Sequence, residues 1–368
     1  MNIITREYIT IFPYYFFMPR RTALLVGINY RNTADELNGC YNDVVNVATY
    51  LRTVLGYAPA AITMLTDGNR GSTFPASVAP TRQNILAGLT ALVAGMVAGD
   101  EAVFHYSGHG TLVRDRNGDE ASGYDSCLCP LDYSAPPSAG GGVVTDDELR
   151  ALLVNRVPRG ARLYVILDCC HNGTGCDIRY KYEDFSLLIS PPSARTSAVW
   201  RTQQKAFVQG KYTDTAGEVY MISGCRDEQT SADAYINNAF AGALTYAIFA
   251  ILRANQASIR TYSWSSLLRD LRYFMRVNKY DQIPQIMTGQ LITPALPVFP
   301  GLASKRGSGA GSGGLALELI SGSVNTSFRG VSSTDPTPNT TLFSFTLKPK
   351  SGANNLTRPP RHAIRFLH

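Results

Sequence analysis

The chain has 368 residues, of which 45% are apolar and 17% charged. This composition is typical of globular proteins and excludes a largely disordered chain; no apolar run reaches the roughly 20 residues of a membrane-spanning helix, so an integral membrane protein is excluded too. The net charge of +6 does not indicate a nucleic-acid-binding domain, because residues 304–368 hold eight basic and two acidic residues and thus account for the whole excess.

Strand-like and helix-like segments alternate along most of the chain. From the N-terminus, the pattern predicts a strand at 22–28, a helix at 40–55, a strand at 62–66, a helix at 81–96, a strand at 101–107, a helix at 145–154, a strand at 162–168, a polar irregular stretch at 178–216, a strand at 219–224, helices at 240–254 and 262–277, and a strand at 282–287. Thr81 is placed to cap the second helix, and Thr145 with Glu148 forms a capping box for the third.

This order predicts an α/β fold, with a mostly parallel central sheet between two layers of helices. Residues 1–20 form an N-terminal extension that is a poor signal peptide, residues 21–300 form the folded domain, and residues 301–368 form a Gly/Ser-rich linker and a basic tail that we expect to be disordered. Seven cysteines without a paired CxxC motif favour a reducing, cytoplasmic location.

Two reactive side chains follow strands of this sheet. His109, between two glycines, comes directly after the strand at 101–107, and Cys170 comes after the strand at 162–168. Ligands of such sheets bind beyond the carboxyl ends of the strands, so the two side chains can meet there. A histidine base next to a thiol creates a thiolate nucleophile.

The same edge offers donors for an oxyanion. The backbone N–H of Gly110 can approach closely, and the N–H of Cys170 is the natural second donor. Each residue also has an ordinary interpretation: His109 as a loop histidine on a tight turn, with about even odds, and Cys170 as a buried cysteine. His105, inside a strand, is more typical of a core residue.

Seven segments together resemble the metacaspases, which are caspase-like cysteine peptidases. They are ALLVGINY (23–30), LNGCYNDV (37–44), FHYSGHGT (104–111), YDSCLCPLDY (124–133), VVTDDELRALL (143–153), VILDCCHNGTG (165–175) and MISGCRDEQTSADA (221–234). The chain departs from the family motif at Asn172, where the family usually has serine. The resemblance implies a caspase-like three-layer αβα sandwich, in which His109 is the general base and Cys170 the nucleophile of an endopeptidase associated with programmed cell death.

The resemblance also implies the specificity. Metacaspases cut after Arg or Lys, and a pocket for a basic side chain needs buried carboxylates. Asp43 and Asp168 match the acids of the family's pocket, and Cys40 and Ser107 match other lining positions. From the sequence alone, Asp43 is equally well explained as an acid favoured by a helix N-terminus, and Asp168 as a strand-end turn residue.

Calcium is the cofactor that the resemblance implies, as an activator. Its hard-oxygen site in the family has four aspartates, which correspond here to Asp125, Asp146, Asp147 and Asp177. Asp146 and Asp147 are alternatively the ordinary acids of a helix's first turn. Residues 115–119 resemble the start of an EF-hand loop, but the glycine and glutamate that such a loop needs are missing, so we reject that site.

The domain then divides into a larger half at about 21–178, a linker at 179–216 and a smaller half at 217–300. An Arg/Lys-specific peptidase can process itself in this basic linker, and the short linker resembles type I metacaspases without their prodomain.

We expect a monomer that acts on proteins or peptides and binds no nucleic acid. The alternatives are a catalytically weak homologue that serves as a scaffold or regulator, and an adaptor that binds nucleic acid or membranes through the tail.

Overall fold

The computed structural model describes residues 19–68, 78–118, 120, 122–134, 142–169, 176–184, 200–204, 214–224, 233–236, 239–293, 295–299, 340–343 and 364–367. The chain divides into two compact units. The first consists of Met1–Phe185 and Val199–Pro300, and the second of Ser186–Ala198 and Gly301–His368.

An eight-stranded sheet forms the centre of the first unit. In spatial order its strands are β2 (Ile62–Thr66), β1 (Arg21–Gly27), β3 (Glu101–Ser107), β7 (Arg162–Asp168), β10 (Glu218–Ser223), β13 (Gln285–Thr288), β8 (Tyr180–Asp184) and β9 (Trp200–Gln204). The strands from β2 to β10 pair in parallel, and β13, β8 and β9 continue the sheet antiparallel. The prediction of a mostly parallel sheet is therefore confirmed.

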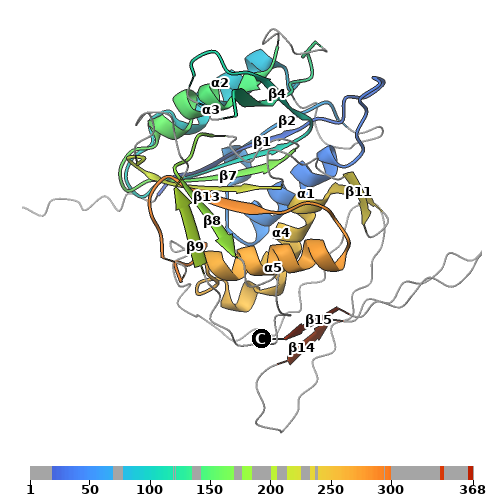
Figure 1. Ribbon diagram of the computed structural model, residues 1–368, viewed down its shortest axis with the longest axis vertical. Helices are drawn as coiled ribbons and strands as arrows, with labels where there is room; N and C mark the ends of the chain where they lie inside the picture. The colour runs from blue at the N-terminus through green and yellow to red at the C-terminus, as the bar shows by residue number, and fades with distance from the viewer. Residues whose placement is uncertain are drawn as a thin grey trace, which may run out of the picture. The chain divides into compact units, whose positions relative to one another are not determined.

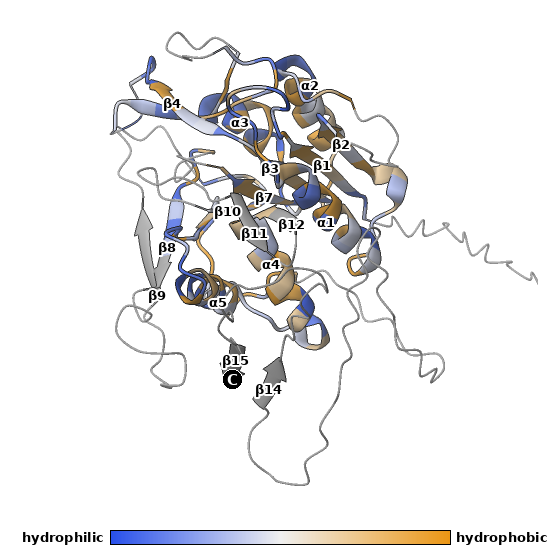
Figure 2. Cartoon of the chain, turned by 90° about the vertical axis from the view of Figure 1, so that its right-hand side faces the viewer, coloured by the Kyte–Doolittle hydropathy of each residue, from blue (hydrophilic) through white to orange (hydrophobic). Residues whose placement is uncertain are grey.

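Helices cover both faces of this sheet (Figure 1). On one face lie α1 (Cys40–Thr53), α4 (Ala243–Ala254) and α5 (Trp264–Val277), and on the other lie α2 (Arg82–Val93) and α3 (Asp146–Leu152). Short 3₁₀ turns occur at Pro59–Ala61, Val154–Arg156 and Gln256–Ser258. The layers are held together by burial of apolar side chains, which gather along the central strands β1, β3 and β7 (Figure 2).

The helix caps predicted from the sequence are present. Thr81 accepts a hydrogen bond from the backbone N–H of Asn84 at the start of α2. Thr145 and Glu148 form the reciprocal capping box of α3. Each cap supplies an acceptor to N–H groups that the first turn of a helix leaves without a partner inside the helix.

Three segments differ from the sequence-based prediction, because strand pairing decided their structure. The stretch 178–216 is not wholly irregular, since it contributes β8 and β9, and Tyr182 of β8 is buried beside β13. The helix expected from residue 240 begins at Ala243, because β12 (Ala239–Gly242) pairs with β11 (Asp233–Ile236). Also missed is a small antiparallel sheet of β4 (Gly110–Arg114), β5 (Tyr124–Leu128) and β6 (Val144–Thr145).

The second unit contains a described antiparallel pair, β14 (Thr340–Phe343) with β15 (Ile364–Leu367). The rest of the predicted tail, like residues 1–18, lies outside the described residues. Among the described helices of both units, none has the length and apolar character needed to cross a bilayer.

Candidate active site and metal site

His109 lies in the turn between β3 and β4, beyond the carboxyl end of the parallel strands. Its Nε2 is 2.7 Å from the backbone oxygen of Asp35. Because a carbonyl oxygen only accepts, this contact is a hydrogen bond when Nε2 carries the proton, and Nδ1 of the neutral ring is then the acceptor. The contact with Asp35 therefore selects the tautomer in which Nδ1 carries no proton.

Two buried tyrosines hold the backbone of His109. The N–H of His109 donates to Tyr30 Oη at 2.9 Å, Tyr106 Oη donates to the His109 carbonyl at 2.8 Å, and the ring centroids of Tyr30 and His109 are 4.7 Å apart. Burial raises the pKa of both tyrosines well above the ordinary value, so both hydroxyls stay protonated. A Cβ at Gly108 would come within 2.8 Å of Tyr106 Oη, which explains the glycine before His109.

The predicted pocket acids lie together at the same edge. Asp43, in the first turn of α1, is fully buried, and its Oδ2 accepts a hydrogen bond from Ser107 Oγ at 2.7 Å. Asp168 ends β7, is 3% exposed and is in register with Ser107. Cys40, the first residue of α1, is also buried. The four residues therefore come from three elements that converge where β3 and β7 end.

Sequence reasoning missed two residues of this group. The N–H of Gly242 lies 3.1 and 3.0 Å from the two carboxylate oxygens of Asp43, and the N–H of Thr245 donates to Asp168 Oδ2 at 2.8 Å. Both residues belong to the first turn of α4, about 200 residues from Asp43 in the chain. The sequence signal, a glycine directly before an apolar helix, is too common to indicate this contact.

The predicted nucleophile lies outside the described residues. Cys169 is buried directly after β7, whereas residues 170–175 are not described. Gly110, the other predicted oxyanion donor, begins β4 next to His109. The roles of Cys170 and Gly110 therefore remain predictions.

An acidic cluster lies on the opposite side of the sheet from α4. One carboxylate oxygen from each of Glu120, Asp146 and Asp177 lies within 4.8 Å of the others, and the two aspartates are each 1% exposed. Two of the four aspartates predicted to bind calcium are thus in one cluster, and Glu120 was missed. The fit to calcium is good, because three carboxylates, two of them buried, supply the hard oxygens that Ca²⁺ prefers.

The other two predicted ligands have described contacts nearby. Asp125, on β5, is 6% exposed, and with Asp146 it adds to the effect of burial in raising the pKa of the Cys127 thiol. Asp147 Oδ2 accepts a hydrogen bond from the side chain of Asn117 at 2.7 Å. Among the described residues, the carboxylates close enough together to share a metal ion are those of Glu120, Asp146 and Asp177, and neither Asp125 nor Asp147 belongs to that group.

Glu120 belongs to the loop that resembles an EF-hand in sequence. Asp115 Oδ1 accepts the N–H groups of Asn117 and Gly118 at 2.9 and 2.7 Å, and its Oδ2 accepts that of Glu120 at 3.0 Å. Asp115 therefore shapes the turn that carries Glu120 toward the cluster. The acidic character of this loop was the sequence signal for Glu120.

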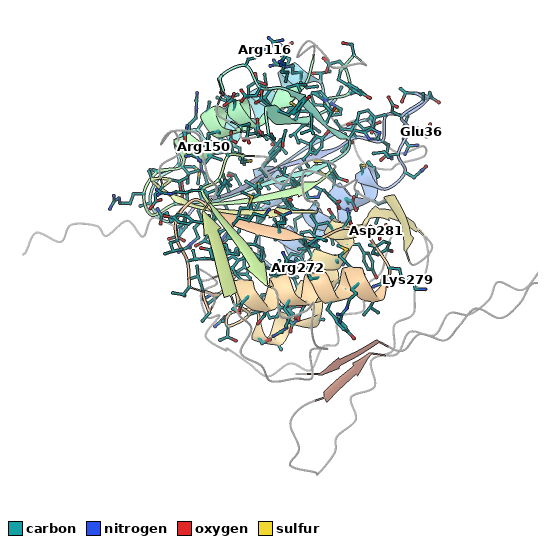
Figure 3. All side chains as sticks on the ribbon, viewed as in Figure 1. Glu36, Arg116, Arg150, Arg272, Lys279 and Asp281 are labelled. Carbon is teal, nitrogen blue, oxygen red and sulfur yellow. The ribbon has the colours of Figure 1, made fainter. Side chains whose placement is uncertain are left out.

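Asp177 has an unusual backbone conformation, with a φ of 49°. Its carbonyl accepts a hydrogen bond from Nη1 of the buried Arg150 at 2.6 Å (Arg150 is labelled in Figure 3). A left-handed conformation is costly for a residue other than glycine and is found often at functional sites. Arg150 of α3 thus ties the strained segment after residues 170–175 to the helix that begins with Asp146.

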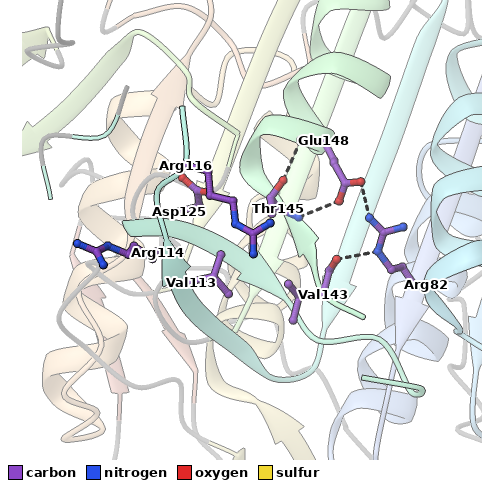
Figure 4. Close-up of a pocket in the computed structure, with 8 residues that line it drawn as sticks. All are labelled: Arg82, Val113, Arg114, Arg116, Asp125, Val143, Thr145 and Glu148. Carbon is purple, nitrogen blue, oxygen red and sulfur yellow. Dashed lines mark hydrogen bonds and ion pairs between the residues drawn. The ribbon is translucent and has the colours of Figure 1, made fainter. Parts of the chain in front are cut away.

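A pocket of about 190 Å³ lies beside β5 and α3. It is lined by Arg82, Val113, Arg114, Arg116, Asp125, Val143, Thr145 and Glu148 (Figure 4). Glu148 pairs with Arg82 and also closes the capping box of α3, so part of the positive charge is neutralised within the pocket.

Comparisons with known proteins agree with these features. Residues 21–179 match the family model described as metacaspase, peptidase C14 domain. The chain is 36% identical to Metacaspase-1 of Mycosarcoma maydis over 301 residues, which cover 74% of this chain and 71% of the relative. It is 35% identical to Metacaspase-1 of Yarrowia lipolytica over 295 residues, or 73% of this chain and 61% of the relative, less than two thirds of that protein's length.

Among solved structures, a crystal structure of a Geobacter sulfurreducens protein matches with a TM-score of 0.50 and 26% sequence identity. The match covers 76% of this chain and 98% of that one. The chain belongs to the metacaspase family of cysteine peptidases and has the family's caspase-like α/β fold.

Proposed function

We propose that this protein is an endopeptidase that cleaves after Arg or Lys through Cys170 and His109. The observation that carries the proposal is the meeting of two buried carboxylates, Asp43 and Asp168, at the strand ends next to His109. Two buried acids at one place are costly unless a cation or hydrogen-bond donors compensate them. A guanidinium or ammonium group of a substrate is a cation of suitable charge and size.

The catalytic cycle follows from the chemistry of the dyad. His109 Nδ1 takes the thiol proton of Cys170, and the thiolate attacks the carbonyl carbon of the scissile bond. The N–H groups of Gly110 and Cys170 stabilise the oxyanion, and His109 then protonates the leaving amine. A water molecule, deprotonated by His109, attacks the thioester and releases the acid product and the thiol. The contact of Nε2 with Asp35 supports this use of Nδ1.

Calcium stimulation is part of the proposal. Asp146, Asp177 and Glu120, with Asp125 and Asp147 from the neighbouring elements, would hold the ion, whose charge would offset that of the carboxylates. Asp177 lies seven residues after Cys170 in the chain, so fixing Asp177 would restrain the segment that bears the nucleophile. Self-processing in the basic linker at 179–216 is proposed on sequence alone, because most of it lies outside the described residues.

We also propose that the protein acts as a monomer. The antiparallel strands β8 and β9 continue the sheet beyond β13, so the edge of β13 is already paired within the chain. A stable dimer in sedimentation would contradict this part of the proposal.

The test is cleavage of peptide reporters that end in Arg, Lys or Asp, with and without millimolar calcium, by wild type and Cys170→Ala. We expect cleavage of the Arg and Lys reporters only, dependent on calcium and absent in Cys170→Ala. Cleavage of the Asp reporter, or cleavage by the variant, would overturn the proposal. Intact mass after incubation with calcium tests self-processing: new ends that do not follow Arg or Lys would contradict it.

A further inference from the structure

The first turn of α4 lies against both acids of the pocket. The backbone N–H of Gly242 donates to the two carboxylate oxygens of Asp43 at 3.1 and 3.0 Å. The backbone N–H of Thr245 donates to Asp168 Oδ2 at 2.8 Å. These groups are among the four N–H donors that a helix leaves without a partner inside the helix, and they carry the positive end of its dipole. The helix therefore offsets part of the carboxylates' charge and fixes their orientation.

No side chain fits at Gly242 without displacing these acids. A Cβ there would be 2.2 Å from Asp168 Oδ2 and 2.8 Å from Asp43 Oδ2, closer than carbon and oxygen atoms approach. The φ of Gly242 is −63°, which any residue can adopt. Glycine is thus required because a side chain would not fit, and not because of the backbone conformation. The volume that a side chain would need is occupied by the carboxylates of Asp43 and Asp168.

A buried histidine supports the same turn. His105 Nε2 lies 3.1 Å from Thr245 Oγ1, in a site with no solvent exposure. Burial lowers the pKa of His105 to about 3, so the ring is neutral at any pH at which a peptidase of this kind works. His105 thus anchors α4 without adding a positive charge that would compete with a basic substrate.

We infer that Gly242 is a specificity-determining residue of the pocket, and that α4 positions Asp43 and Asp168 for a planar guanidinium. This inference rests on the proposed Arg/Lys specificity. A guanidinium is broader than an ammonium and needs both carboxylates in a fixed plane, whereas an ammonium acts as a point charge. A methyl group at Gly242 would therefore reduce binding of Arg more than binding of Lys.

The test compares Gly242→Ala with wild type on Arg and Lys reporters. We expect kcat/KM to fall about 100-fold for Arg and about tenfold for Lys, mainly through KM, because misplaced binding groups cost roughly 100-fold per ångström. Gly88→Ala, on α2 at the other face of the sheet, is the matched control, because its added methyl group would contact the flexible end of the Leu24 side chain of β1. We expect it to change neither value. An equal fall for Arg and Lys, or no fall, would overturn the inference.

A second measurement covers the case in which Gly242→Ala folds poorly. The thermal midpoint is compared for Gly242→Ala in two backgrounds, Cys170→Ala alone and Cys170→Ala with Asp168→Ala, both free of self-cleavage. If the methyl group collides with the carboxylate, the loss in midpoint should shrink by at least half where Asp168 is absent. The same loss in both backgrounds would contradict the inference.

A binding measurement separates this inference from the proposed function. Titration of N-acetyl-arginine amide into the Cys170→Ala protein should show saturable binding that weakens about 100-fold with Gly242→Ala and not with Gly88→Ala. Failure of the Cys170→Ala parent to bind would refute the proposed function itself, and this inference with it. Binding by the parent and equally by Gly242→Ala would refute only the role of Gly242.

Discussion

Replacement of Asp43 by asparagine distinguishes a pocket acid from an ordinary helix N-terminal acid. Asp43 lies in the first turn of α1, where the helix dipole alone would favour it by about 0.3–1 kcal/mol. In the structure its carboxylate is fully buried and accepts hydrogen bonds from Ser107 Oγ and the N–H of Gly242. The two roles predict different effects on activity.

The size of the effect follows from these contacts. A basic substrate that loses one of two desolvated carboxylates loses about 3 kcal/mol of interaction, which is on the order of 100-fold in kcat/KM. Asparagine replaces one carboxylate oxygen by an NH₂ group that cannot accept the N–H of Gly242, and it removes the charge from the hydrogen bonds that remain, so the free energy of unfolding falls by about 1–3 kcal/mol. An acid that served only the helix dipole would leave kcat/KM unchanged.

The assay is cleavage of the Arg reporter by Asp43→Asn, together with urea unfolding in the Cys170→Ala background. Asp132→Asn is the control, because Asp132 accepts the backbone N–H of Arg82 at 2.8 Å at the start of α2, away from the pocket acids. We expect both variants to lose stability, and only Asp43→Asn to lose activity. A kcat/KM for Asp43→Asn within threefold of wild type would refute the assignment of Asp43 to the pocket.

Three further predictions concern the base, the metal site and pH. Tyr30→Phe should lower kcat at least about tenfold with little change in KM, because the N–H of His109 loses its acceptor; an unchanged kcat would exclude Tyr30 as a positioning residue. Asp146→Asn and Glu120→Gln should each weaken calcium binding in calorimetry at least about tenfold, and a Glu120→Gln protein that binds normally would remove Glu120 from the site. His105 has a folded pKa of about 3, below its unfolded value of 6.5, so the unfolded state binds the proton first and stability should fall between pH 6.5 and 3 by up to about 1.4 kcal/mol per pH unit. Urea unfolding of Cys170→Ala at pH 6.5, 5.5 and 4.5 should show this slope, and His105→Gln should reduce it; equal slopes would contradict the reasoning.

Local rules predicted the central elements well. β3 and β7 have the predicted bounds, and the caps at Thr81 and Thr145 are the predicted ones. These features depend on residues within one element or one turn of it. Hydrophobic period and capping chemistry are therefore sufficient to predict them.

Features made by pairing between distant segments were not predictable in this way. β8 becomes a strand because Tyr182 pairs with Ile286, more than 100 residues away. The start of α4 at Ala243 was missed for a different reason: residues 240–242, which were predicted as helix, belong to β12, which pairs with its neighbour in sequence, β11. The hydrophobic pattern within one segment does not indicate which distant strand it pairs with. The polar stretch at 178–216 was therefore wrongly interpreted as irregular throughout.

For the site, the sequence by itself determined the family, through ordered motifs around His109 and Asp168, and it determined which residue types stand at the strand ends. The tertiary structure decided their environment. It alone shows that Asp43 is bonded to Ser107, that Glu120 lies beside Asp146 and Asp177, and that the first turn of α4 donates to Asp43 and Asp168. The physical reason is that charge and hydrogen bonding act through space over a few ångströms, whereas the groups that interact here are separated by 26 to 199 residues along the chain.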